Sequence, residues 1–258
     1  MNKYKAFGIN LALSAGKKIM DGFFSSKIVE NKDDSTFVTD VDKDVNDFVV
    51  QKIEEAFPDY SIISEERGFL DKSSEYVWVC DPLDGTLPYV SGFPAFSFSL
   101  ALVKNGESIF GVIYDPALNR LLVAAKGEGA TLNNQKIVVS KKKILKGSVV
   151  DLSSDFKLFN LRKALIGNNS VFCSTLLASV FGGFLVATGG IEAEIYEFDK
   201  PWDGAAVKII VEEAGGKVTD IFGSEQRYDR PINGFLASNG FLHKELLKIV
   251  KNNFNKKI

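Results

Sequence analysis

Residues 81–86, Asp-Pro-Leu-Asp-Gly-Thr, place two carboxylates three positions apart directly after the apolar run 77–80. That run has the length and composition of a buried strand, and carboxylates at its end are costly to bury unless a positive charge lies between them. Mg²⁺ is the simplest partner, because it takes oxygen ligands from one or two carboxylates and keeps waters and substrate phosphate for the rest. Gly85 would let a phosphate oxygen approach the backbone, and the Thr86 hydroxyl could orient a water. The alternative interpretation of these six residues is an ordinary turn.

Three more acids stand where predicted elements begin or end. Asp42 lies in the first turn of a predicted helix, Glu65 follows a short strand, and Asp203 begins another helix. Two of them also have an ordinary explanation, because Asp42 can form a capping box with Thr39 and a glutamate pair such as the one at Glu65 usually faces solvent. Asp40 is a second candidate for any catalytic role of Asp42.

The composition narrows the chemistry that these acids could support. The 258 residues are 45% hydrophobic and 25% charged, which is typical of a soluble globular protein with a substantial core. The formal net charge of −2 and the pI near 5.6 provide no basic field to attract nucleic acid. His243 is the only histidine, so most serine–histidine and cysteine–histidine triads and most histidine-rich zinc sites are excluded. Carboxylates, hydroxyls and backbone groups are left to do the chemistry.

Neither the cysteines nor the N-terminus indicates export. Cys80 and Cys173 are too few for a disulfide framework, and lysines interrupt the apolar residues of the first predicted helix. We therefore expect no signal peptide, no membrane span and a cytoplasmic location.

Hydrophobic periodicity divides the chain into elements that must position these acids. Apolar residues at helical spacing predict helices over residues 2–21 and 39–57, and residues 22–38 are expected to form a polar loop. The hairpin signal Asn105-Gly106 lies among short strands that form an antiparallel meander. The expected strands are 61–64, 77–80, 96–103, 108–114, 121–125 and 130–139. Residues 1–140 should therefore pack helices on an antiparallel sheet.

The second half of the chain, residues 141–258, begins with the lysine run 141–143 and alternates strands with helices. Strands are expected at 147–152, 170–173, 191–198, 217–220 and 234–237. Helices are expected at 155–165, 176–188 and 203–214, with a last helix carrying Leu242, Leu246, Ile249 and Val250. Gly182-Gly183 indicates close packing of one helix against a neighbour. The alternation is typical of a layered α/β domain.

Taken together and in order, the acidic segments resemble the inositol monophosphatase superfamily of Mg²⁺-dependent, Li⁺-sensitive phosphatases. The matching segments are Val38-Thr39-x-x-Asp42, Glu65-Glu66, Asp81-Pro82-Leu83-Asp84-Gly85-Thr86, Pro201-Trp202-Asp203-Gly204-Ala205-Ala206, Glu213-Ala214-Gly215-Gly216 and Phe235-Leu236-Ala237-Ser238-Asn239. The third and fourth segments form a specific pair, and the resemblance extends from the first helix to about Asn239. The expected fold is of the α/β (α+β) class. It is a layered αβαβα sandwich, with an antiparallel sheet in residues 1–140 and a mixed sheet in residues 141–258.

The resemblance implies two or three Mg²⁺ ions in one site. The first would be held by Glu65, Asp81 and the Leu83 carbonyl. The second would be held by Asp81, Asp84 and Asp203, so that Asp81 bridges the two ions. A third, weaker ion would contact Glu65.

The resemblance also implies how substrate and water are held. Asp42 and the Thr86 hydroxyl would orient the attacking water, so that Asp42, Thr86 and Glu65 form the catalytic group. Backbone N–H groups of Gly85 and Thr86 would bind the phosphate. The implied substrate contacts are Asp84, Gly85, Thr86, Glu197 and Asp203.

The chain departs from the family pattern around the substrate. Many members carry Asn-Phe-x-His-Gly-Phe-Pro after the threonine, whereas this chain has Pro88 and Ser91 in place of the asparagine and the histidine. Residues 173–179 replace a Gly-Ser/Thr-Ala-Ala-like loop. Glu197 stands one residue closer to Asp203 than is common, and an ordinary acid at the end of a strand explains it equally well.

The activity that the resemblance implies is Mg²⁺-dependent hydrolysis of a small phosphorylated polyol or sugar, with inositol monophosphate as the first choice. Alternative enzymes of the same kind are 3′(2′),5′-bisphosphate nucleotidase and fructose-1,6-bisphosphatase. An alternative of another class is a catalytically silent regulatory or binding protein, because some bacterial relatives contact the transcription or RNA machinery. The resemblance further implies a homodimer, and we expect binding of neither nucleic acid nor membrane.

Overall fold

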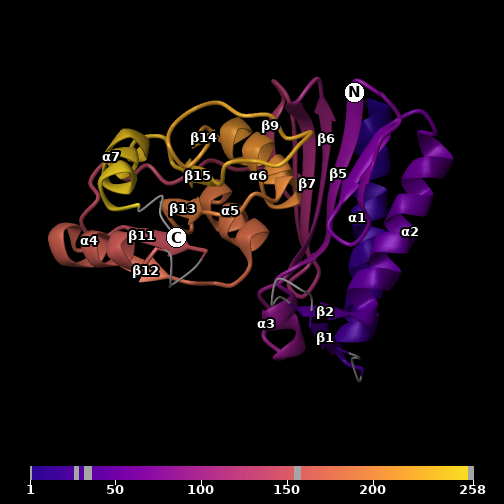
Figure 1. The fold of residues 1–258 in the computed structure, drawn as a ribbon, viewed down its shortest axis with the longest axis horizontal. Helices are drawn as coiled ribbons and strands as arrows, with labels where there is room; N and C mark the ends of the chain where they lie inside the picture. Colours follow the sequence, from indigo (N-terminus) through magenta and orange to yellow (C-terminus); the bar gives the residue numbers. More distant parts are fainter. Residues whose placement is uncertain (1, 26–28, 32–36, 154–157, 255–258) are drawn as a thin grey trace.

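The computed structural model describes residues 2–25, 29–31, 37–153 and 158–254, which fold into five alternating layers of helices and sheets (Figure 1). An eight-stranded and a five-stranded sheet are separated by one layer of helices and covered by another on each outer side. From one side to the other, the helices are α1 (Asn2–Phe23) and α2 (Asp40–Ala56), then α5 (Ser179–Ala187) and α6 (Pro201–Glu213), then α4 (Phe159–Asn169) and α7 (His243–Asn253). The predicted αβαβα sandwich is therefore confirmed. None of the helices in these described ranges is long and apolar enough to cross a membrane.

The larger sheet has the strand order β10-β9-β8-β7-β6-β5-β3-β4. Its strands are β3 (Ser61–Ser64), β4 (Gly68–Leu70), β5 (Tyr76–Asp84), β6 (Ser97–Lys104), β7 (Glu107–Asp115), β8 (Arg120–Ala125), β9 (Gly129–Leu132) and β10 (Gln135–Lys136). The predicted antiparallel meander is confirmed, but the segment expected as one strand at 130–139 turns at residues 133–134 and forms the two strands β9 and β10. The sheet is not wholly antiparallel, however, because β3 and β5 pair in parallel. The unpredicted strand β4 reverses the chain after β3, and a second reversal then sends β5 in the direction of β3.

The smaller sheet has the strand order β12-β11-β13-β15-β14 and is mixed, as predicted. Strand β11 pairs in parallel with β12 and β13, whereas β15 pairs antiparallel with β13 and β14. The strands are β11 (Val149–Leu152), β12 (Phe172–Ser174), β13 (Ala193–Tyr196), β14 (Lys217–Thr219) and β15 (Phe235–Ser238). The helix expected from residue 155 begins at Phe159, and residues 155–157 lie outside the described ranges.

A two-stranded ribbon occupies part of the segment expected to be a loop. Strands β1 (Val29–Asn31) and β2 (Phe37–Thr39) pair antiparallel, while residues 26–28 and 32–36 lie outside the described ranges. The expectation was wrong here because the few apolar residues among polar ones did not reveal that Val38 is buried.

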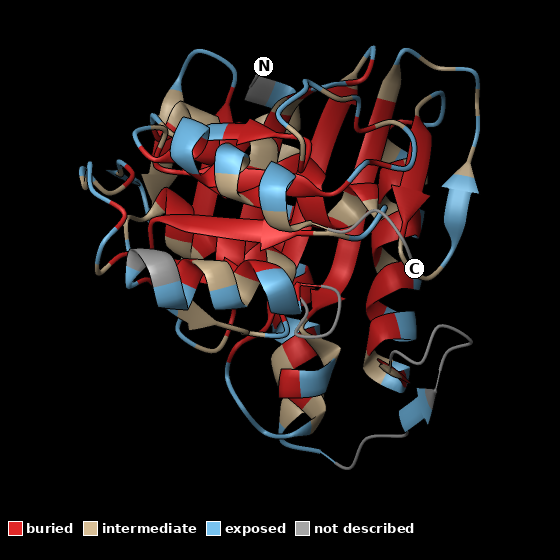
Figure 2. Cartoon of the chain, turned by 60° about the vertical axis from the view of Figure 1, so that its left-hand side comes forward, coloured by how far each residue is buried: buried red, intermediate tan, exposed pale blue. Residues whose placement is uncertain are grey.

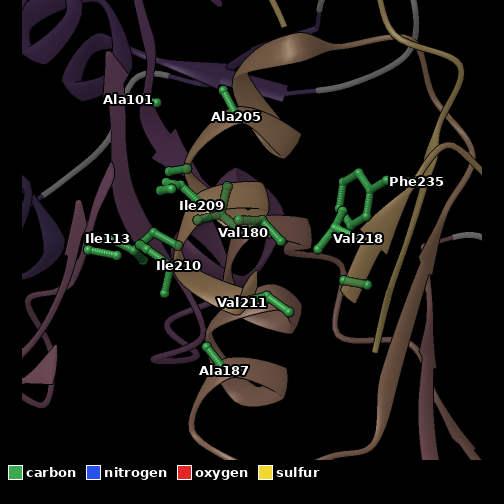
Figure 3. Close-up of a cluster of buried hydrophobic side chains, with 14 of the residues drawn as sticks. Ala101, Ile113, Val180, Ala187, Ala205, Ile209, Ile210, Val211, Val218 and Phe235 are labelled. Carbon is green, nitrogen blue, oxygen red and sulfur yellow. The ribbon is translucent and has the colours of Figure 1, made fainter. Parts of the chain in front are cut away.

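Three apolar cores separate the layers. One lies between α1, α2 and the larger sheet, one surrounds α5 and α6 between the two sheets, and one lies under α4 and α7. Figure 2 shows the strands largely buried, whereas the outer helices present exposed faces. Figure 3 shows the middle core, where Val180 of α5 and Ile209 of α6 lie between Ile113 of β7 and Phe235 of β15. The middle helices are thus held from both sides. The division of the chain at residues 140 and 141 stays a prediction.

The predicted close packing at Gly182-Gly183 is confirmed on α5. A Cβ atom on Gly183 would lie 2.5 Å from Cγ2 of Val207 on α6, and one on Gly182 would lie 2.7 Å from the Glu194 carboxyl carbon. Both distances are too short for any side chain, so these glycines set how closely α5 approaches α6 and β13.

Replacing Gly183 by alanine should lower the free energy of unfolding by about 1–3 kcal/mol, because overpacking a close-packed core costs that much. Gly167 in α4 is the matched control, since no neighbouring atom lies within 4 Å of the position of its missing Cβ. Alanine at 167 should raise the free energy of unfolding by roughly 0.5–1 kcal/mol through helix propensity. Urea denaturation of both variants and the parent measures the difference, and a stabilising Gly183→Ala would contradict the packing described here.

Candidate metal and phosphate site

Three aspartates from two distant parts of the chain meet where β5 ends and α6 begins. Asp81 and Asp84 lie at the end of β5, and Asp203 lies in the first turn of α6. One carboxylate oxygen from each lies within 4.8 Å of the other two. All three side chains are buried. The sequence predicted this convergence, and the structure confirms that the three carboxylates are gathered.

A bulge in β5 lets Asp81 and Asp84 serve one site. Residues three apart on a regular strand point to opposite faces of the sheet. The pairing of β5 with β6 shifts register between Asp81 and Asp84, around Pro82, which brings the second carboxylate to the side of the first. The sequence interpretation as a turn after the strand is therefore refined, because the strand continues through the motif as a bulge.

Hydrogen bonds fix the Asp84 carboxylate from two directions. The Phe181 N–H, in the first turn of α5, donates to it at 2.9 Å. The Ser97 hydroxyl on β6 donates at 3.2 Å, and the Ser179 hydroxyl oxygen lies 3.4 Å from the carboxylate. The positive end of the α5 dipole therefore faces this carboxylate, which favours its charged form.

The Asp203 carboxylate is held by two hydroxyl groups that the sequence analysis missed. Ser179 at the start of α5 donates to it at 2.6 Å, and the Tyr196 hydroxyl at the end of β13 donates at 2.5 Å. The sequence did not single out Ser179, because the helix was expected from residue 176 and begins at Ser179 only in the structure. Nothing in the sequence distinguished Tyr196, because the pairing of β13 with β15 decides where its side chain points.

Burial and mutual repulsion dominate the electrostatics of the cluster. Burial raises the pKa of Asp84 to about 7, and the nearby charge of Asp203 adds to the effect. Burial likewise raises the pKa of Asp81 well above its usual range, with contributions from Glu65, Asp203 and Asp84. A divalent cation would offset both the cost of burying these charges and the repulsion between them. Carboxylate oxygens are the ligands that Mg²⁺ prefers. The donor set of this chain therefore fits Mg²⁺.

Asp42 makes hydrogen bonds in two directions. It completes the predicted capping box at the start of α2, where one carboxylate oxygen accepts from the Thr39 N–H at 2.8 Å. Its other oxygen accepts from the Thr86 hydroxyl at 3.1 Å, and this hydroxyl also lies 3.3 Å from the Leu83 carbonyl. Asp40 is exposed. The geometry therefore pairs Asp42, rather than Asp40, with Thr86.

Gly85 begins the short helix α3 (Thr86–Val90) in a conformation that favours glycine. Its φ is +83°, in the left-handed region. A Cβ atom there would lie 2.6 Å from the Ala95 carbonyl oxygen and 2.9 Å from the Ala178 Cβ. Backbone conformation and space therefore both require glycine between Asp84 and Thr86.

The two predicted glutamates are placed differently. The Glu65 N–H donates to the Cys80 carbonyl at 3.3 Å across the β3–β5 pair, which sets Glu65 level with Asp81. Its charge contributes to the raised pKa of Asp81, although Glu65 is not one of the three carboxylates within 4.8 Å. Glu197 follows β13, and its N–H donates to the Ser153 hydroxyl at 3.2 Å. Its contact with substrate stays a prediction.

One further acid, Glu194 on β13, was not predicted to lie near this site. Its side chain is 0% exposed, and among the described residues neither carboxylate oxygen has a hydrogen-bond partner. Burial raises its pKa well above the usual range, with Asp151, Asp84 and Asp203 adding to the shift. Gly182 leaves the room that its carboxyl occupies. The sequence signal that could have revealed Glu194 was the presence of an acid within the strand expected at 191–198.

The family model for inositol monophosphatases matches residues 1–254. The chain belongs to the inositol monophosphatase family. The "Fructose-1,6-bisphosphatase/inositol-1-monophosphatase" of Thermotoga maritima is 36% identical over 251 residues, covering 95% of this chain and 94% of that protein. The "Nus factor SuhB" of Pasteurella multocida is 34% identical over 265 residues, covering 99% and 96%. The solved IMPase structure from Thermotoga maritima superposes with a TM-score of 0.88 at 33% identity, covering 98% of each chain.

These comparisons confirm the resemblance on which the sequence analysis relied. They cover the whole sandwich, so the layers and the acidic cluster belong to one family fold. The names of the relatives differ between a phosphatase and a Nus factor. Membership of the inositol monophosphatase family therefore establishes the scaffold and the candidate acidic site. It does not identify the substrate.

The pKa of Asp84 predicts how Mg²⁺ stabilisation depends on pH. Because this pKa is raised from 3.8 to about 7, the metal-free folded protein binds a proton that the unfolded chain releases. The contribution of Asp84 to stability therefore falls as the pH rises between these values. Mg²⁺ needs ionised carboxylates, so the increase in Tm at a fixed, subsaturating Mg²⁺ concentration should be larger at about pH 8 than at about pH 6. Thermal melts with and without Mg²⁺ measure it.

Asp84→Asn should lose most of this Mg²⁺-dependent increase in Tm, because one ligand of the cluster is gone. Asp59→Asn is the matched control, since Asp59 is exposed in the turn after α2. An increase in Tm that is the same for Asp84→Asn and the parent would remove Asp84 from the metal site.

Proposed function

We propose that this protein is a Mg²⁺-dependent phosphomonoesterase that hydrolyses a small phosphorylated metabolite. The observation that carries the proposal is the convergence of Asp81, Asp84 and Asp203 within 4.8 Å, beside the hydrogen-bonded pair Asp42–Thr86. Membership of the inositol monophosphatase family supports the same chemistry. The residues that would hold Mg²⁺ are Glu65, Asp81, Leu83, Asp84 and Asp203. Leu83 would bind through its backbone carbonyl oxygen, and the others through their carboxylates. When bound, Mg²⁺ supplies Lewis-acid stabilisation of charge on the phosphoryl group.

The protein's own groups would position the attacking water. The Thr86 hydroxyl donates to Asp42, so its lone pairs can accept a hydrogen bond from a water. Burial raises the pKa of Asp42, which makes this carboxylate a better proton acceptor near neutral pH. Asp42 would therefore hold Thr86 in the correct orientation and receive a proton from the water through it.

The backbone at Gly85 would receive the phosphate. The N–H groups of Gly85 and Thr86 would donate to a phosphate oxygen. Asp84 and Asp203 would hold the cation beside the phosphate, and Glu197 would contact the alcohol part of the substrate. Fixed donors of this kind stabilise the charge that develops on the equatorial oxygens in phosphoryl transfer.

Phosphate release from a small panel tests the proposal. With Mg²⁺, the purified protein should hydrolyse at least one of inositol 1-phosphate, fructose 1,6-bisphosphate and adenosine 3′,5′-bisphosphate. Asp203→Asn should lower kcat/KM by about a hundredfold or more while Tm without metal is maintained, because only a charged ligand is lost. Asp59→Asn should behave as the parent. Inositol 1-phosphate and fructose 1,6-bisphosphate come first because the Thermotoga maritima relative is named for both activities.

A regulatory protein is the second candidate, favoured by the identity of 34% to a protein named Nus factor SuhB. The absence of Mg²⁺-dependent release from every phosphomonoester tested would favour it. The homodimer, the inhibition by Li⁺ and the cytoplasmic location implied by the family resemblance stay predictions.

Thr86→Ala should lower kcat by about 10²–10⁴-fold and leave KM within a few-fold, because the hydroxyl acts on the water rather than on the substrate. Thr86→Ser is the matched control, since it keeps the hydroxyl and should recover most of the activity. Steady-state kinetics on the best substrate of the panel measure both variants. A change confined to KM would contradict the role given to Thr86.

A further inference from the structure

The outer layer beside the five-stranded sheet carries an unbalanced positive charge. It consists of helices α4 and α7 and of the segment 140–148, which leads into β11. These three segments contain nine lysine and arginine residues but only one acid, Glu245, although the whole chain has 31 basic and 33 acidic residues. The formal net charge of −2 is therefore an average over a basic outer layer and an acidic remainder.

Seven lysines of this layer are exposed, and none of them forms an ion pair with another described residue. On other elements, by contrast, Lys5, Lys43 and Lys126 each have a carboxylate oxygen within 3.2 Å of the ammonium nitrogen. The charge of the outer layer is thus not neutralised locally, and it is available to an anionic partner. We define the basic face as these seven lysines, namely Lys141, Lys143, Lys146, Lys163, Lys244, Lys248 and Lys251.

Contacts between the three segments join their lysines into one surface. The Gly147 N–H donates to the carbonyl of Ser170, directly after α4, at 2.9 Å. The side-chain amide of Asn239, shortly before α7, donates to the Lys142 carbonyl at 2.8 Å. Leu145 belongs to the apolar core that lies under both helices. Figure 2 brings this side of the molecule forward and shows the exposed faces of its helices.

Exposed apolar side chains lie among these lysines. Ile144 is 71% exposed and lies in the same loop as Lys143. Phe241 is 54% exposed, and the Lys143 ammonium lies 5.2 Å from the centre of its ring. Ile166 is 49% exposed on α4, one turn after Lys163. Isoleucine cannot stack on a nucleic-acid base, whereas the interface of a bilayer accepts lysines and apolar side chains together.

We propose that the basic face is a docking surface for a membrane that contains anionic phospholipids. The lysines would contact the charged headgroups, and Ile144 and Phe241 would enter the boundary between headgroups and acyl chains. A cluster of about four to eight basic residues is the usual number for recognition of anionic lipid. The protein would lie on the bilayer, in agreement with the finding that no described helix could span it.

This proposal is independent of the proposed phosphatase function. The basic face lies on the far side of the five-stranded sheet from α6, which carries Asp203 (Figure 1). The expectation that the protein binds no membrane rested on the net charge of the whole chain, and the net charge does not reveal how lysines are distributed over the layers.

Cosedimentation of the full chain with lipid vesicles tests the proposal. One set of vesicles is phosphatidylcholine alone, and the other also contains about 30% phosphatidylserine. The protein should bind the vesicles with phosphatidylserine at about 50 mM salt and should bind phosphatidylcholine only weakly. Raising the salt to about 500 mM should remove most of the binding, because salt screens the attraction between exposed charges.

Two triple variants with the same change in net charge show whether the basic face is responsible. The first combines Lys143→Gln, Lys146→Gln and Lys244→Gln. It should lower the partition coefficient for vesicles with phosphatidylserine by about a hundredfold, since each lysine near an anionic surface contributes about fivefold. The control should bind as the parent does, and it combines Lys5→Gln, Lys43→Gln and Lys126→Gln. Thermal melts of both variants check that the fold is maintained.

Ile144→Ser keeps the charge and should lower the same partition coefficient by about tenfold, because less apolar surface enters the bilayer. Leu118→Ser is its control, at a 60% exposed leucine between β7 and β8, and should have no effect. Equal binding to both kinds of vesicle, binding to neither, or undiminished binding by the first triple variant would overturn the proposal. Binding to a 20-nucleotide RNA without binding to phosphatidylserine would overturn it too, and would assign the basic face to nucleic acid.

Discussion

Repulsion among carboxylates that are withdrawn from water is the constraint on which the site depends. Asp81, Asp84 and Asp203 lie within 4.8 Å of one another, and burial raises the pKa of both Asp81 and Asp84. Such an arrangement is unfavourable in the absence of a cation, because burial and like charges both oppose ionisation. The surrounding structure tolerates it by supplying donors, namely the N–H groups and hydroxyl at the start of α5 and the hydroxyl of Tyr196.

The middle layer of helices connects this local chemistry to the whole sandwich. Helix α6 carries Asp203 in its first turn, and α5 brings Ser179 and Phe181 to the acids. Both helices are packed between the two sheets, and Gly183 lets them approach closely. A shift of α6 would separate Asp203 from the two aspartates of β5, and a shift of α5 would withdraw the donors of Ser179 and Phe181. Stability of the middle core and integrity of the metal site are therefore expected to change together.

The parts of the site differ in how rigidly the fold determines them. The acids, the bulge in β5 and Gly85 belong to strands, helix starts and a close backbone approach. The loop between β12 and α5, by contrast, carries side chains that can change without disturbing the layers. This division is consistent with a family in which one relative is named a phosphatase and another a Nus factor.

The sequence by itself determined the features that depend on neighbouring residues. Helical periodicity predicted α1 and α2, the Thr39–Asp42 spacing predicted the capping box, and the hairpin signal predicted the meander. The carboxylates of residues 81–86 indicated a cation site, and the ordered acidic segments revealed the family, whose resemblance then implied that Asp203 shares the site. The helices, the capping box and the meander could be predicted because local spacing dictates which side chains share a face.

Only the tertiary structure decided the features that depend on pairing between distant segments. The parallel pairing of β3 with β5, the choice of Asp42 over Asp40, and the hydroxyl groups of Ser179 and Tyr196 on Asp203 are of this kind. The burial of Glu194 also follows from packing against other layers. The physical reason is that a side chain's direction depends on strand register and helix placement, which are set by burial of apolar surface across the whole sandwich.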